Sequence, residues 1–171
     1  MAGRAPRPRR AGPAARLTRA GGTTRFAVVA ARFNEPITKK LVDGAMHALT
    51  AAHVAAADVD VHWVPGSFEL PQAAAHLART RRYAAIVCLG VVIRGQTPHF
   101  EHIAREAAAG IREVGLRTGV PTTFGVITAL NEEQAWERAG GDVANRGQEA
   151  AEAAFEMAAF VRRQRPRPGR R

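Results

Sequence analysis

The residues with the clearest chemical potential lie between positions 90 and 100. A β-branched run ends in a glycine turn, and Thr97 and Pro98 then stand where a helix can begin. Threonine is a good N-cap residue and proline is favoured at the first helical position, which places His99 in the first turn. Free backbone N–H groups at the positive end of a helix therefore lie beside an imidazole that exchanges protons near neutral pH. This combination suits a substrate that bears a phosphate or another oxyanion.

The same segment comes close to the P-loop of nucleotide-binding proteins. Gly90 and Gly95 have the required spacing, but Gln96 stands where that motif has lysine. Without the ammonium group the loop lacks the charge that engages β- and γ-phosphates, so hydrolysis of a nucleoside triphosphate is disfavoured. The backbone amides of Gln96 and Thr97 suffice for one phosphate monoester, although an ordinary glycine turn with a cap explains the segment equally well.

His99 is either a surface histidine or a proton-transfer group, and its place beside the proposed anion site favours the second interpretation. The other histidines lack a comparable setting, and no pair has metal-ligand spacing with a supporting carboxylate or cysteine. The sequence therefore predicts no metal site. Lysine occurs only at Lys39 and Lys40, both expected on the exposed side of a helix, so a Schiff-base mechanism is hard to build.

Further candidate side chains come from residues 65–71 and from two single positions. Glu69 either accepts hydrogen bonds from hydroxyl or ring N–H groups of a ligand, or simply favours the start of a helix. Phe33 follows the first strand and is a core residue or a platform for a flat ring, and the pattern alone favours the core. Arg138 either complements the C-terminal dipole of its helix or binds a phosphate.

Short strands that alternate with longer helices must position these residues. Strands are expected at residues 25–31, 59–64, 84–92 and 123–128. Helices are expected at about 37–52, 70–77, 100–114 and 148–161. A further helix begins at a cap formed by Asn131, with Gln134 in capping-box spacing, and is closed by Gly140. The pattern predicts an α/β fold, a three-layer αβα sandwich with a four-stranded parallel sheet of flavodoxin-like type and helices on both faces. Ligands bind outside the carboxyl ends of such strands, which selects residues 32–35, 65–69, 93–99 and 128–131.

The composition predicts one globular domain between two basic tails. The chain has 171 residues and no apolar run that approaches the roughly 18 residues needed to span a bilayer. Its formal net charge is +10, of which residues 1–25 contribute +7 and residues 162–171 contribute +6, so that the part between them carries −3. We expect a domain at 23–162 between disordered tails at 1–22 and 163–171, with weak RNA or membrane-surface contact by the tails as the alternative. Cys88 is the single cysteine, which excludes a disulfide within the chain and favours a cytoplasmic setting.

Together these segments closely resemble the lumazine synthase family. The resemblance extends from about residue 25 to residue 160 and leaves out the arginine tails. It is carried by residues 32–34, 64–71, 90–100, 124–128, 133–135 and 137–140, and by Asn131, Asn145 and Gly147. The order and the spacing of all these segments agree with the family.

The resemblance implies a transferase that uses neither a cofactor nor a metal. Its substrates would be 5-amino-6-(D-ribitylamino)uracil and 3,4-dihydroxy-2-butanone 4-phosphate, and its products 6,7-dimethyl-8-ribityllumazine, phosphate and water. This is the penultimate step of riboflavin biosynthesis. The imine forms between the two substrates, which explains why no catalytic lysine is needed.

The resemblance also assigns roles to individual positions. His99 would move protons, and Gln96 and Thr97 would bind the phosphate. The pyrimidine and its ribityl chain would be held by Phe33, Ser67, Phe68, Glu69, Val91, Val92 and Ile93, with Phe33 stacked on the ring. Phe124 and Arg138 would reach in from a neighbouring subunit, Arg138 to the phosphate. Arg146 stands where many relatives have a lysine near the phosphate, and a planar guanidinium is not equivalent to an ammonium.

A homo-oligomer, at least a pentamer with active sites between neighbouring subunits, is implied as well. The short connection at residues 140–145 resembles that of relatives that build a 60-subunit icosahedral shell, although the glycine that these often have before Asn145 is missing. Association with riboflavin synthase is a further option. A pentamer or shell that only binds a flavin-like ligand or RNA, and a flavodoxin-like carrier of FMN, remain the alternative functions.

Overall fold

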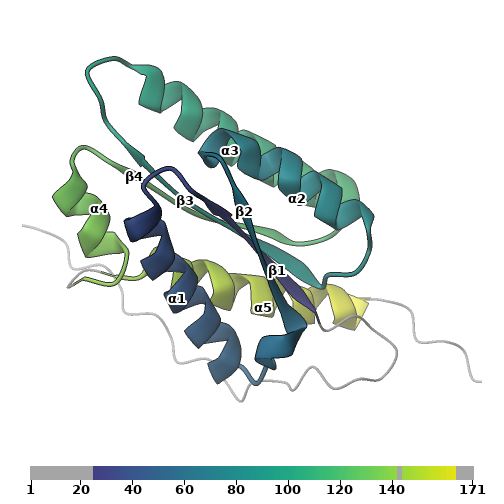
Figure 1. Cartoon of the computed structure of the whole chain (residues 1–171). Coiled ribbons are helices and arrows are strands. Elements are labelled where there is room, and N and C mark those ends of the chain that lie inside the picture. Colours follow the sequence, from purple (N-terminus) through teal and green to yellow (C-terminus); the bar gives the residue numbers. More distant parts are fainter. Residues whose placement is uncertain (1–24, 142–143, 165–171) are drawn as a thin grey trace, which may run out of the picture.

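Strands and helices alternate along the described part of the chain (Figure 1). The computed structural model describes residues 25–141 and 144–164. The strands are β1 (Phe26–Ala31), β2 (Val59–Val64), β3 (Ala85–Ile93) and β4 (Thr122–Ala129). The helices are α1 (Glu35–Ala51), α2 (Leu70–Arg79), α3 (His99–Thr118), α4 (Glu132–Arg138) and α5 (Arg146–Gln164), with short 3-10 turns η1 (Ala56–Asp58) and η2 (Ser67–Glu69). The predicted tails lie outside the described residues, apart from Arg163 and Gln164, which end α5.

All the strands pair in parallel in one sheet with the order β2-β1-β3-β4. The central strands β1 and β3 are buried almost throughout, which is why their sequences are continuously apolar instead of alternating. The strands β2 and β4 form the edges of the sheet and are only partly buried. The predicted α/β sandwich with a parallel sheet is therefore confirmed, and each strand differs from its expected bounds by one residue at most.

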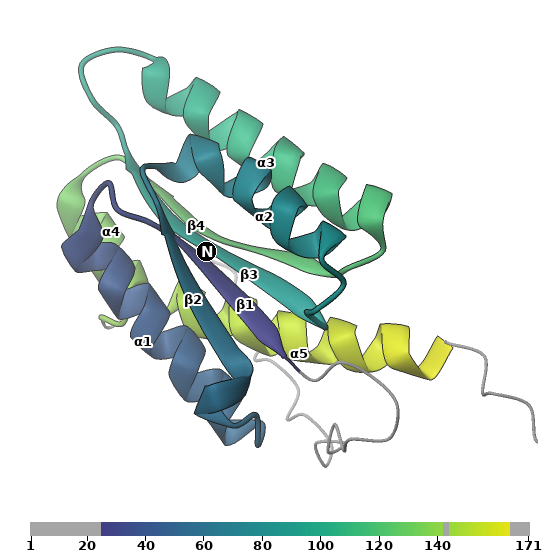
Figure 2. The same cartoon turned by 45° about the vertical axis from the view of Figure 1, so that its right-hand side comes forward.

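Helices cover both faces of the sheet, as the turned view shows (Figure 2). On one face α1 and α5 pack through side chains such as Leu41 and Phe155, and on the other α2 and α3 pack through Leu70 and Ile111. Parallel strands that return through such crossovers end at the same edge of the sheet. The loops after β1, β2 and β3 therefore meet at one edge, and α4 lies beside the end of β4.

The caps and ends of α3 and α4 show how the structure differs in detail from the prediction. Thr97 is not the N-cap of α3, because Pro98 occupies that position and its carbonyl accepts a hydrogen bond from Glu101 N at 2.9 Å. The side chain of Asn131 does cap α4, where its oxygen accepts from Gln134 N at 2.9 Å, but Gln134 reaches back to Leu130 N and not to Asn131. The helix α4 ends at Arg138, two residues before the glycine expected to close it.

Candidate active site

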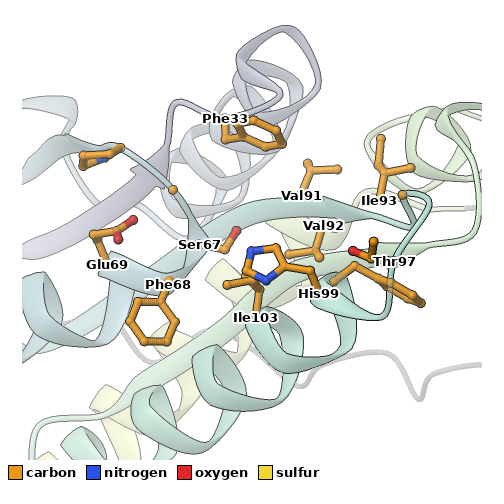
Figure 3. Close-up of a pocket in the computed structure, with 14 residues that line it drawn as sticks. Phe33, Ser67, Phe68, Glu69, Val91, Val92, Ile93, Thr97, His99 and Ile103 are labelled. Atoms are coloured by element: carbon orange, nitrogen blue, oxygen red, sulfur yellow. The ribbon is translucent and has the colours of Figure 1, made fainter.

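The carboxyl edge of the sheet holds a cavity of about 460 Å³ between the loops after β1, β2 and β3 and the first turns of α3 (Figure 3). We call this cavity the first pocket. Its lining is Phe33, Pro65, Gly66, Ser67, Phe68, Glu69, Val91, Val92, Ile93, Gly95, Thr97, His99, Phe100 and Ile103. The structure thus brings together most of the site residues that the sequence predicts, although they come from three separate stretches of the chain.

Two residues of this lining were expected elsewhere. Phe100 and Ile103 belong to the apolar stripe of α3, and the sequence assigns that stripe to the core. In the structure they pack partly against the core and partly line the first pocket. Helical periodicity shows which face of a helix is apolar, but it does not show whether that face packs against the core or lines a cavity. The sequence pattern therefore could not predict that these two side chains line the pocket.

Exposed aromatic rings flank the first pocket. Phe33 is 69% exposed and Phe68 is 55% exposed, so the interpretation of Phe33 as a core residue is wrong. The backbone of Phe33 is nevertheless held, because its N–H donates to Pro65 O at 3.0 Å. A bare aromatic face on a fixed loop suits the stacking of a flat ring.

The polar side chains of the loop after β2 are not all satisfied within the chain. Ser67 is only 5% exposed, points into the first pocket (Figure 3), and its hydroxyl has no hydrogen-bond partner among the described residues. A Cβ atom at Gly90 would lie 2.5 Å from this hydroxyl, so the glycine leaves the space that Ser67 occupies. The half-buried carboxylate of Glu69 forms no ion pair within the described part of the chain. Both groups are therefore free for a ligand.

The start of α3 presents hydrogen-bond donors at the same pocket. Thr97 and His99 line it, and the imidazole projects between Val92 and Ser67 (Figure 3). The amides of Gln96 and Thr97 donate to no acceptor in the described part of the chain. Since Thr97 does not cap the helix, its hydroxyl is also available. Gln96 is exposed and its side chain is not part of the lining, so only its backbone supports the predicted role.

The remaining predicted residues gather in a second pocket. This cavity of about 520 Å³ lies along the edge strand β4 and is lined by Thr123, Phe124, Val126, Ile127, Thr128, Arg138, Arg146, Glu149, Ala150 and Ala153. Phe124 is 44% exposed there. Arg138 donates to Gln134 O at 2.9 Å and lies 3.5 Å from Glu137, and Arg146 pairs with Glu149. One copy of the chain therefore does not bring these arginines to His99.

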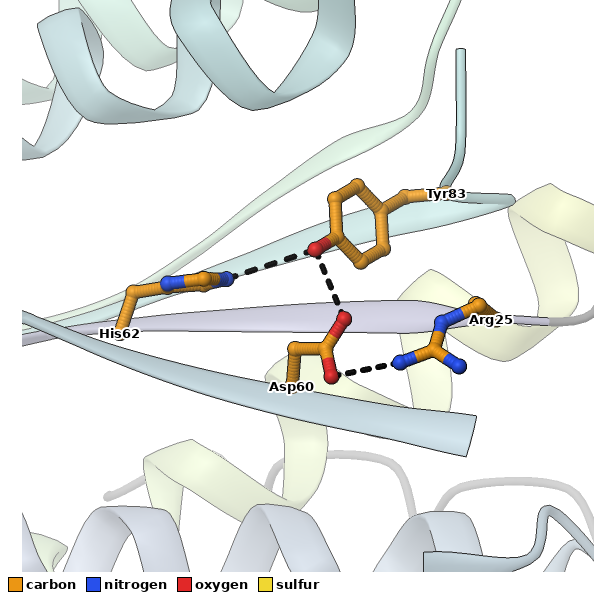
Figure 4. A network of polar contacts seen from close by, with 4 residues as sticks. All are labelled: Arg25, Asp60, His62 and Tyr83. Atoms are coloured by element: carbon orange, nitrogen blue, oxygen red, sulfur yellow. Dashed lines mark hydrogen bonds and ion pairs between the residues drawn. The ribbon is translucent and has the colours of Figure 1, made fainter. Parts of the chain in front are cut away.

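Cys88 and a polar network around Asp60 lie outside the two pockets. Burial raises the pKa of the Cys88 thiol to about 12, so this cysteine is no nucleophile at neutral pH. Near the amino ends of β1 and β2, Asp60 accepts hydrogen bonds from Arg25 at 2.6 Å and from the Tyr83 hydroxyl at 2.8 Å, and His62 lies 3.4 Å from that hydroxyl (Figure 4). The first two contacts lower the pKa of Asp60, and burial together with Asp60 raises the pKa of Tyr83.

The described ranges also lack two other kinds of feature. No group of three or more His, Cys, Asp or Glu residues within 25–141 and 144–164 is arranged to hold a metal ion. None of the helices described is long and apolar enough to cross a membrane.

Comparison with known protein families identifies the family of this chain. The family model described as 6,7-dimethyl-8-ribityllumazine synthase matches residues 23–162, which is most of the chain. That range contains every element of the sheet and all residues of both pockets. The chain therefore belongs to the 6,7-dimethyl-8-ribityllumazine synthase family, whose members are transferases of riboflavin biosynthesis.

Proposed function

We propose that this chain condenses 5-amino-6-(D-ribitylamino)uracil with 3,4-dihydroxy-2-butanone 4-phosphate to form 6,7-dimethyl-8-ribityllumazine. Family membership supports this reaction, and one observation supports it for the chain itself. The first pocket combines a bare aromatic ring, a half-buried carboxylate and an imidazole at a helix N-terminus. A flat pyrimidine can stack on the aromatic ring, and the hydroxyl groups of its ribityl chain can donate to the carboxylate. The phosphate ester of the second substrate suits the helix N-terminus beside the imidazole.

The pyrimidine would bind on the side of the pocket that β1 and β2 provide. Phe33 offers its face to the ring, and the backbone of residues 91–93 lies along the pocket wall. Glu69 accepts hydrogen bonds from ribityl hydroxyl groups, and the unpartnered hydroxyl of Ser67 gains a partner when the ligand enters. Phe68 covers the open side of the ligand.

The phosphate ester would bind at the start of α3. The amides of Gln96 and Thr97 and the positive end of the helix stabilise its charge. The amine of the pyrimidine attacks the ketone carbon, water leaves to give an imine, phosphate is eliminated, and a second attack with loss of water closes the ring. His99 gives a proton to each departing oxygen and accepts one from the reacting carbon or nitrogen. Most of the catalysis comes from holding the two substrates together in one orientation.

A neighbouring copy would complete the site. None of the residues that line the first pocket in the described structure is an arginine or a lysine, although a phosphate dianion is expected to bind there. The second pocket, on the edge strand β4, holds Arg138, Arg146 and the exposed ring of Phe124. We therefore place Phe124 and Arg138 of one subunit against the first pocket of the next in a homo-oligomer, a pentamer at least.

The direct test mixes the two substrates with the purified full-length chain and follows the absorbance of the lumazine product. We expect the rate to be proportional to the protein concentration and to exceed the uncatalysed background. Product formation at the background rate would overturn the proposal. A bound flavin spectrum in the protein as isolated, together with no turnover, would support a flavin carrier instead.

A further inference from the structure

One side chain joins three helices and is the neighbour in sequence of an arginine that lines the second pocket. Asn145 precedes α5, and its amide nitrogen donates to Lys40 O of α1 at 3.1 Å and to Ala139 O after α4 at 3.1 Å. Its amide oxygen accepts from Gly147 N at 2.9 Å and from Gln148 N at 3.0 Å, which caps the start of α5. Both donors and both acceptor positions of the amide are thus used within the chain.

We call Asn145 and the four backbone groups that it contacts, at Lys40, Ala139, Gly147 and Gln148, the joint. Two glycines make room for it. A Cβ atom at Gly44, in the middle of α1, would lie 2.3 Å from the amide oxygen of Asn145. A Cβ atom at Gly147 would lie 2.0 Å from Leu41 O, so the backbone of α5 directly touches that of α1. Glycine inside a helix is unfavourable relative to alanine, and here the close approach of the amide and the two helices offsets that cost.

The joint adjoins both arginines of the second pocket. Ala139, whose carbonyl accepts from Asn145, directly follows Arg138, and Arg146 directly follows Asn145 itself. The backbone pairing of Ala139 with Asn145 closes the segment between α4 and α5. One amide group therefore holds backbone that is adjacent to both arginines.

From this geometry we propose that Asn145 is a positioning residue that orients Arg138 and Arg146 toward the phosphate of the substrate. The inference rests on the proposed function, in which Arg138 serves the phosphate site of a neighbouring copy, and it adds Arg146 to that site. Asn145 itself touches no substrate. Its effect reaches the phosphate through the position of α4 and of the start of α5.

The test uses Asn145→Asp, which keeps the shape of the side chain and the oxygen that caps α5. It replaces the two N–H donors by an oxygen that faces the carbonyl groups of Lys40 and Ala139. We expect the KM for the phosphate-bearing substrate and the inhibition constant of inorganic phosphate to rise on the order of tenfold, while the KM for the pyrimidine changes less than about twofold. Gln148→Ala, at an exposed position of the same helix, is the matched control and leaves all three constants unchanged.

Gly44→Ala provides a second approach that leaves Asn145 itself in place. Its methyl group displaces the amide, so we expect the same rise of the phosphate constants. In an Asn145→Ala background the space is free, and Gly44→Ala then adds no further rise and does not lower the thermal midpoint. A lower thermal midpoint in Asn145→Asp and Gly44→Ala with unchanged phosphate constants would show that the joint is merely structural and would overturn the inference.

Arg138→Ala separates this inference from the function on which it rests. If Arg138→Ala raises the phosphate constants and Asn145→Asp does not, the inference alone fails. If Arg138→Ala leaves them unchanged, the proposed phosphate contact fails and the inference fails with it. Agreement requires that Asn145→Asp has little further effect in a background that carries both Arg138→Ala and Arg146→Ala, because the arginines that Asn145 positions are then absent.

Discussion

The first and the second pocket are similar in size but offer opposite chemistry. The first is built at the ends of the inner strands and at the start of α3, and combines aromatic rings, a carboxylate and an imidazole without a cationic side chain in its described lining. The second lies along the edge strand β4 and holds two arginines beside one exposed phenylalanine. In the function proposed above, these pockets are complementary halves of an active site that contact between copies would bring together.

Among the changes to the two pockets, removal of the imidazole is expected to have the largest effect on turnover. His99→Ala should lower kcat by roughly 10- to 10⁴-fold, because one acid–base group is lost from the first pocket. Turnover is measured by product absorbance at saturating concentrations of both substrates. His102→Ala is the control, since this histidine is exposed on the same helix and does not line the pocket. An unchanged kcat in His99→Ala would show that the imidazole takes no part in catalysis.

Loss of a cation from the second pocket should act on one substrate only. Arg138→Ala is expected to raise the KM for the phosphate-bearing substrate by about 10- to 100-fold, the value of a charge-assisted hydrogen bond, with little change for the pyrimidine. Steady-state kinetics with each substrate varied in turn measures both constants. Arg117→Ala, at an exposed arginine paired with Glu113, controls for the loss of charge alone. Equal changes in both constants would argue against a phosphate contact.

The pyrimidine side of the first pocket should respond to smaller changes. Ser67→Ala removes one neutral hydrogen-bonding group and is expected to raise the KM for the pyrimidine by about 2- to 12-fold. Gly90→Ala should have a similar effect, because its methyl group displaces the Ser67 hydroxyl. The double variant should be no worse than Ser67→Ala, since only ordinary contacts then remain near the new methyl group. A double variant with additive losses would contradict this coupling.

A change remote from both pockets should leave the kinetics unchanged. The folded state lowers the pKa of Asp60 below its ordinary value of 3.8, so its stabilising contribution is complete above that pH and is lost as the pH falls through the lower folded-state value. Asp60→Asn should therefore lower the thermal midpoint at pH 7, and the difference from the unaltered chain should shrink below pH 3.8. Thermal unfolding from pH 7 to pH 3 measures this, and a constant difference would show that the ion pair contributes nothing. Neither KM should change.

Much of the fold was predictable because local patterns determine it. The continuous apolar run of β3 and the helical spacing along α1 and α3 are read directly from neighbouring residues. The cap of α4 was found from Asn131 and Gln134 in the same way. The cap of α3 was predicted one residue too early, because Thr97 and Pro98 are neighbouring candidates for it. In the structure Pro98 is the cap residue.

The site was only partly predictable from the residues themselves. The ends of parallel strands selected the right loops, but apolarity alone placed Phe33 in the core, whereas the structure leaves its ring bare. Phosphate binding by Arg138 was one of two interpretations of the residue itself. That Phe124 and Arg138 reach a neighbouring subunit came only from the family resemblance, since no local pattern relates an edge strand to a pocket on another copy. The joint at Asn145 was missed because its contact with Lys40 O joins residues 105 positions apart.

Complementation between two impaired variants tests the divided active site most directly. His99→Ala impairs only the first pocket and Arg138→Ala only the second, so a mixed oligomer contains some sites in which both halves are intact. If the chains are produced together in equal amounts and assemble at random, about a quarter of the sites should regain full turnover at subsaturating phosphate substrate. Activity no higher than the mean of the two separate variants, in oligomers shown to contain both chains, would contradict the account.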